Sequence, residues 1–163
     1  MKSGHILLVG GLLLASFGML YGLHYAVLVE HQTLDRMGGS LTQAFVSAAQ
    51  RNPDGVQVAL QAYSSTKYDY IRQVDAHSHW IGLAMMMAIF GLVFERVNLE
   101  EKVRKLIAAA LLAGSILFPL SVLLQTYDHD SLWTKALAIT GSGLVIAALA
   151  ATAWGFFRPA TSS

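Results

Sequence analysis

The chain has 163 residues, of which 55% are hydrophobic and 13% are charged, about half the charged fraction of a soluble domain. Its 11 basic and 10 acidic residues give a formal net charge of +1, so no bulk field would attract a polyanion. These values exclude an ordinary water-soluble globule, a disordered chain and a nucleic-acid-binding domain. The absence of cysteine excludes disulfides, thiolate-bound zinc and covalently attached haem, so that any haem would be held non-covalently by His or Met.

Four runs without Asp, Glu, Lys or Arg predict four membrane-spanning helices, because about 20 apolar residues cross the hydrocarbon core. The first run, residues 6–29, is longer than the apolar core of a cleaved signal peptide. The second, residues 80–94, is short and spans only if the segment from Asp75 enters the polar edge of the membrane. We therefore expect an all-α integral membrane protein in the lipid bilayer, one domain of residues 1–163 folded as a four-helix transmembrane bundle. The expected spans are residues 6–29, 75–95, 106–125 and 134–157.

The distribution of Lys and Arg predicts the orientation of the bundle. Basic residues are densest in the short segments at one end, namely Lys2, the turn at residues 96–105 and Arg158. Such segments stay in the cytoplasm, so both termini are expected there, with a bacterial inner membrane as the expected location.

The long loop at residues 30–73 is expected outside the cytoplasm and should contain short amphipathic helices. Its first part has apolar residues at steps of three and four, the spacing of one helix face: Leu34, Met37, Leu41, Phe45 and Ala48. Residues 52–55 predict a turn and residues 56–63 a second short helix, and Thr66 is a plausible N-cap for the helix that enters the second span. Because the polar face of the first helix is poor in Lys and Arg, we expect it to cover the bundle rather than lie on the membrane.

Rows of small residues in the first and fourth spans predict close helix packing, because small side chains let helices approach in lipid. The first span carries Gly11, Ala15, Gly18, Gly22 and Ala26, and the fourth carries Gly143, Ala147, Ala151 and Gly155. Both rows are predicted to be packing faces without chemistry of their own.

Histidines are the main candidates for chemistry, and five of the six are expected at the end of the bundle that carries the long loop. His24 lies inside the first span and His31 just beyond it, His77 and His79 stand at the start of the second span, and His129 precedes the fourth. Imidazole is the commonest neutral metal ligand, and ionisable groups inside membrane bundles are usually functional.

Haem b requires two axial imidazoles from facing helices and an apolar pocket for the macrocycle. His24 opposite His77 or His79 would meet this requirement, with the porphyrin between the first two spans. His79 lies above Gly82, where the missing side chain would make room for a flat group. The chain would then be a cytochrome b-like electron-transfer subunit of a respiratory or quinone-linked complex, working between a quinone pool or redox partner and a protein outside the membrane.

Two further interpretations stay open. A copper or zinc site could use mixed nitrogen and oxygen ligands from the same region. Its candidate ligands are His24, His77, His79, His129, Asp75, Asp128 and Asp130, with His31 as a further alternative. Two carboxylates beside His129 suit either the orientation of a ligand or a proton relay. The third interpretation is a cofactor-free structural or assembly subunit that packs against partner subunits or further copies of the chain.

The segment that starts the second span also resembles a known family. Residues 77–84, HSHWIGLA, and their continuation to residue 92 resemble the H-x-H helix start of small haem b-binding membrane proteins akin to haem–copper oxidase subunit I. In that family the histidines at the outer end of a helix are haem or metal ligands, so the resemblance, over about 20 residues, implies His77 and His79 as ligands. The third and fourth predicted spans contain no histidine, so the resemblance does not extend to a second haem or a binuclear oxygen-reducing centre. It leaves open whether the chain is an enzyme or a subunit of an oxidoreductase.

Overall fold

The structure is a computed structural model that describes residues 2–159. Within this range it contains five α-helices and no strand: α1 (Ser3–Leu28), α2 (Glu30–Ala49), α3 (Pro53–Val93), α4 (Glu101–Leu124) and α5 (Leu132–Phe157). A short 3-10 helix, η1 (Phe94–Arg96), follows α3. α1, α4, α5 and the helical stretch that includes α3 are each long and apolar enough to cross a membrane, which confirms an all-helical chain with four candidate spans.

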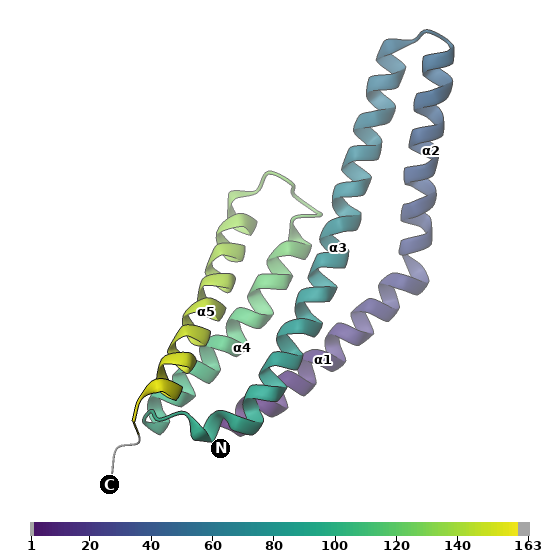
Figure 1. Ribbon diagram of the computed structural model, residues 1–163. Coiled ribbons are helices and arrows are strands. Elements are labelled where there is room, and N and C mark those ends of the chain that lie inside the picture. The colour runs from purple at the N-terminus through teal and green to yellow at the C-terminus, as the bar shows by residue number, and fades with distance from the viewer. Residues whose placement is uncertain (1, 160–163) are drawn as a thin grey trace.

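The four spans form a bundle in which α1 lies along α3 and α5 lies along α4, while α3 and α4 join the two pairs (Figure 1). α1 begins and α5 ends at the same end of the bundle, which we call the terminal end (Figure 1). At the opposite end, α2 and the first half of α3 form an antiparallel hairpin that extends beyond α4 and α5 (Figure 1). We call residues 30–72 the hairpin and this end of the bundle the hairpin end.

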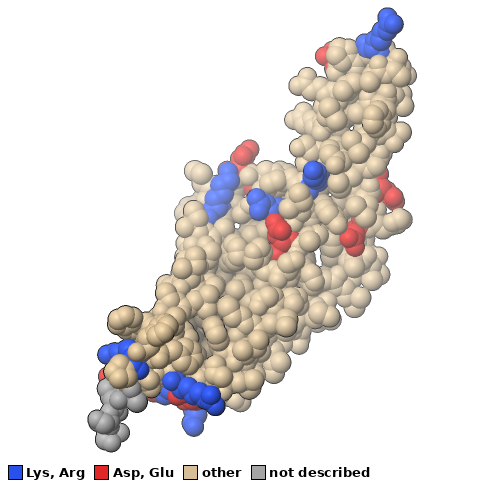
Figure 2. All heavy atoms as spheres, viewed as in Figure 1, with Lys and Arg blue, Asp and Glu red and all other residues tan. Residues whose placement is uncertain are grey.

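Charged side chains mark both ends of the bundle. On the face shown in Figure 2 they lie at the terminal end, around the base of the hairpin and at its tip, with an uncharged band between the two ends. Such a band is what a hydrocarbon core requires, because an unpaired charge in lipid is costly. The cytoplasmic placement of the terminal end stays a prediction.

α3 is a single helix of 41 residues, about 60 Å long and twice as long as a membrane span requires. The start of α3 is stabilised, because the side chain of Asn52 accepts a hydrogen bond from the Gly55 amide at 3.0 Å and Pro53 occupies the first turn. The prediction of a separate helix at residues 56–63 is wrong. Thr66 does not cap a new helix, because it lies inside α3, where its hydroxyl donates to the Ala62 carbonyl at 2.9 Å.

α2 does not cover the bundle, so the prediction that the first helix of the long loop would lie over the bundle is wrong. Because α3 does not break, its first half stands out from the bundle, and α2 packs along it (Figure 1). The buried residues of α2 are the small or polar Thr33, Ala44 and Ser47, whereas Phe45 of the predicted apolar face is 75% exposed. The spacing of the apolar residues correctly predicted that they share one face of α2. It did not show that this face would be left without a packing partner.

The row of small residues on α1 packs as predicted, and the row on α5 does so only in part. A β-carbon at Gly11 would lie 2.8 Å from the carbonyl oxygen of Ala84, so the backbones of α1 and α3 are in direct contact there. On α5, Gly143 has no neighbouring atom within 4 Å of that position, while a β-carbon at Gly141 would lie 2.6 Å from the amide nitrogen of Phe118 on α4. The face of α5 that meets α4 therefore passes through Gly141.

Candidate functional site

His77 lies between α3 and α1. Its Nδ1 is 3.0 Å from the carbonyl oxygen of Gly18, and its ring fills the notch beside Gly22, where a β-carbon would lie 3.0 Å from Nε2. Because a carbonyl can only accept, Nδ1 carries the proton of this bond. The two glycines of α1 thus leave room for one imidazole, and helix packing accounts for the position of His77.

His79 lies on another side of α3, since two residues correspond to about 200° of helix rotation. Its Nδ1 donates to the carbonyl oxygen of Asp75 at 2.6 Å, and its ring meets the ring of Phe118 edge to face at 4.7 Å. One turn further along, Gly82 has no atom within 4 Å of a β-carbon position. His79 is therefore half-buried at the edge of an open face of α3, with Nε2 unprotonated in the neutral tautomer.

His24 is exposed on α1 and lies two residues after Gly22, which contacts His77. It therefore points about 200° away from that contact, and the structure does not bring His24 together with His77. The backbone contact at Gly11 and the imidazole at Gly22 also leave no gap for a macrocycle between α1 and α3. A porphyrin between the first two spans of one chain does not fit this arrangement.

The acidic residues and outer histidines form separate pairs. His129 donates through Nε2 to Asp69 at 2.8 Å, and Asp75 pairs with Arg72 at 4.0 Å. Of the remaining predicted residues, Asp128 and Asp130 are exposed on either side of His129 in the α4–α5 connection, where Asp130 pairs with Lys135 at 4.0 Å, and His31 is 3.6 Å from Asp35 on the surface of α2. Across residues 2–159, no group of three or more His, Asp or Glu side chains is placed to hold a metal ion.

A polar stripe on α3 at the hairpin end was missed by the sequence analysis. Arg72 stacks over the ring of Tyr68 at 4.9 Å, and the Tyr68 hydroxyl donates to Gln125 at the end of α4 at 3.3 Å. Tyr68, Arg72, Asp75 and His79 follow one another at steps of four, three and four, so that they share one face of α3. The spacing is visible in the sequence, but these residues form one stripe only because the helix is continuous through residues 56–79.

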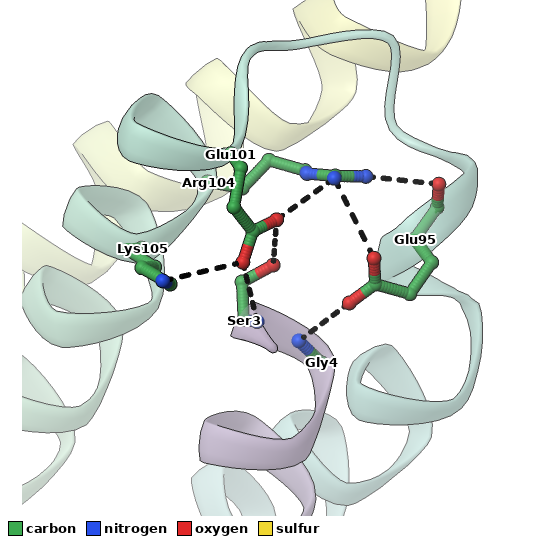
Figure 3. A network of polar contacts seen from close by, with 6 residues as sticks. All are labelled: Ser3, Gly4, Glu95, Glu101, Arg104 and Lys105. Carbon is green, nitrogen blue, oxygen red and sulfur yellow. Dashed lines mark hydrogen bonds and ion pairs between the residues drawn. The ribbon is translucent and has the colours of Figure 1, made fainter. Parts of the chain in front are cut away.

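A second set of residues, from the start of α1 and from the segment that joins α3 to α4, forms a clamp at the terminal end (Figure 3). The first amide groups of a helix lack intrahelical partners, and α1 has no side-chain cap of its own. Instead, the Ser3 amide donates to Glu101 at 3.1 Å and the Gly4 amide donates to Glu95 at 3.2 Å. Arg104, with only 16% of its side chain exposed, bridges the two carboxylates at 2.8 Å from Glu101 and 3.5 Å from Glu95.

The fold therefore indicates a helical integral membrane protein with four candidate spans and a helical hairpin beyond one end of its bundle. No protein-family model, curated protein or solved structure matches the chain.

Proposed function

We propose that this protein is an assembly subunit of a membrane complex, in which the four spans anchor the chain and the hairpin binds a partner protein. The observation that carries the proposal is the uncovered apolar face of α2. Phe45 is 75% exposed and Leu34 is 46% exposed. Exposed apolar surface of this kind is typical of interaction sites.

A protein partner accounts for this face better than lipid does. The hairpin extends past the ends of α4 and α5 (Figure 1), so its outer part lies beyond the uncharged band of the bundle (Figure 2). Helices that lie on a membrane usually carry Lys and Arg on the polar face, whereas α2 contains one Arg, Arg36, and no Lys. An amphipathic partner helix would bury the apolar face with side chains at positions three and four apart.

A photo-crosslinking amino acid at Phe45, in the full chain in its native membrane, tests this proposal. We expect a discrete heavier product from position 45 and none from Gln43, an exposed position about 200° away on the same helix. Phe45→Ser should weaken the complex, while the free energy of unfolding changes by less than about 0.5 kcal/mol, because the side chain is already exposed. Equal products from both positions, or lipid adducts alone at position 45, would contradict the proposal.

A second candidate function is electron transfer through haem b bound at His79. A carbonyl that accepts from Nδ1 holds the tautomer in which Nε2 is free for iron, and the open space beside Gly82 suits a macrocycle. Arg72 lies seven residues before His79 on the same face, within the reach expected for pairing with a propionate. When bound, the haem would supply the redox chemistry, and His79 would provide one of its two axial imidazoles, with the second supplied by another chain.

The absorption spectrum of detergent-purified protein, expressed with ample haem, tests this second function. We expect a Soret band that is lost in His79→Ala and kept in His24→Ala, because His24 is exposed on α1, whereas His79 lies on α3 beside Phe118 of α4. Elemental analysis of the same preparation distinguishes haem iron from copper or zinc. The absence of a Soret band, or a band that survives His79→Ala unchanged, would remove haem binding at this residue.

A further inference from the structure

A polar cavity of about 220 Å³ lies at the hairpin end, between α2, α3 and the residues that follow α4. α2 contributes Thr33 and Arg36, α3 contributes Asp69 and Gln73 among others, and Thr126 with Tyr127 completes the wall. None of the apolar residues proposed to bind a partner lines this cavity, and neither does His79. It is therefore a separate feature of the molecule.

The cavity has a cation and an anion in its wall that do not neutralise each other. The Arg36 guanidinium donates to the Gln32 carbonyl and to the Thr33 hydroxyl, both at 3.3 Å, and has no carboxylate partner within the described chain. Asp69 accepts from His129 through Oδ1, and no hydrogen bond to its Oδ2 is present among residues 2–159. Each charged group thus retains hydrogen-bonding capacity for an occupant.

Neutral groups beside the cavity have unused hydrogen-bonding capacity as well. Gln73 accepts the Tyr21 hydroxyl through Oε1 at 3.0 Å, which leaves its amide NH₂ group without a bond to the described residues. The Tyr25 hydroxyl is buried without a hydrogen-bond partner, although its ring lies beside the cavity residue Tyr70, at 6.4 Å between ring centroids. A polar group buried in this way costs free energy unless an acceptor or donor reaches it.

We propose that this cavity binds a small zwitterion, with its ammonium group on Asp69 and its carboxylate or phosphate on Arg36. A carboxylate accepts well from an ammonium group, and a guanidinium binds carboxylate and phosphate through paired N–H donors. The volume suits a molecule the size of an amino acid, which is smaller than the ligands of typical drug-sized pockets. At the hairpin end, where the spans meet the aqueous phase, a free amino acid and an ethanolamine phosphate headgroup present the same pair of charges.

Calorimetric titration and thermal unfolding of the detergent-purified full chain test the proposal, with glycine, L-alanine and O-phosphoethanolamine as probes. We expect saturable binding that raises the unfolding temperature, and a loss of affinity of about tenfold or more in Arg36→Gln and in Asp69→Asn. Asp35→Asn is the matched control, because this exposed residue neighbours Arg36 in sequence but does not line the cavity. His129→Ala should retain binding, since it leaves the Asp69 carboxylate in place.

Nanodiscs distinguish the two sources of the zwitterion. Stabilisation by phosphatidylethanolamine relative to phosphatidylglycerol, lost in Asp69→Asn, would identify a lipid headgroup, whereas stabilisation by free amino acids alone would identify a soluble ligand. The proposal is overturned if no zwitterion binds at millimolar concentration. It is equally overturned if ethanolamine or acetate alone binds as tightly, or if Arg36→Gln and Asp69→Asn bind like the unaltered chain.

Discussion

Gly11→Ala should separate α1 from α3 and lower the free energy of unfolding by about 1–3 kcal/mol, the usual cost of overfilling a tight contact. The added β-carbon would lie 2.8 Å from the Ala84 carbonyl oxygen and 2.8 Å from the Ala88 amide nitrogen. Both are backbone atoms, so no flexible side chain can move aside. Denaturant unfolding of the purified chain in detergent, followed by circular dichroism, measures the loss.

Gly82→Ala is the matched control for this substitution. Gly82 also lies in a helix that crosses the bundle, but no atom is within 4 Å of its β-carbon position. Alanine is a better helix former than glycine by about 1 kcal/mol in a soluble helix, so this variant should be as stable as the original chain or more stable. Equal destabilisation by the two substitutions would show that α1 and α3 are not in backbone contact at Gly11.

Glu101→Gln should loosen the start of α1 and abolish part of the pH dependence of stability. Partial removal from water raises the pKa of Glu101, but the Ser3 amide and the positive charge of Arg104 lower it by more, so the net pKa is lowered. Glu101 lies ahead of the uncharged run at residues 106–124 that spans the bundle. The substitution also leaves Arg104, which is largely buried, with Glu95 as its remaining acidic partner.

The direction of the pH effect follows from the lowered pKa. A carboxylate with a lower pKa in the folded state contributes stability that is fully present above the ordinary range of a glutamate. This contribution is lost as the pH falls through the folded value. Unfolding temperatures measured across acidic pH should therefore fall more steeply for the original chain than for Glu101→Gln, while Glu100→Gln, in the adjacent exposed residue, should follow the original chain. Identical pH profiles for Glu101→Gln and the original chain would show that the clamp contributes nothing.

The hairpin shows which structural features the sequence pattern could predict and which it could not. The spacing from Leu34 to Ala48 correctly predicted a helix, because apolar periodicity reports the backbone conformation locally. The same spacing could not reveal that Thr33, Ala44 and Ser47 would face α3. Thr66 likewise matched a capping pattern. Its hydroxyl nevertheless donates to a carbonyl within α3, because the helix that precedes it continues through this position without a break.

The candidate sites depended more strongly than the helices did on how separate parts of the chain pack together. His77 and His79 were identified from sequence, and their positions two residues apart already implied different directions on a helix. Their surroundings were not predictable, because Gly18 and Phe118 come from other helices. The pairing of His129 with Asp69 joins residues 60 positions apart, and the bond from Ser3 to Glu101 joins residues 98 apart.

The sequence by itself determined the class of this protein, because the cost of placing a charge in hydrocarbon acts on each residue, and the uncharged runs record it directly. It also determined the approximate number and place of the spans. The tertiary structure alone decided which glycines meet a neighbouring backbone, which histidine faces open space, and that Arg36 and Asp69 line one cavity. These features depend on how separate helices are positioned, and a local pattern cannot encode the partner that a helix face will meet.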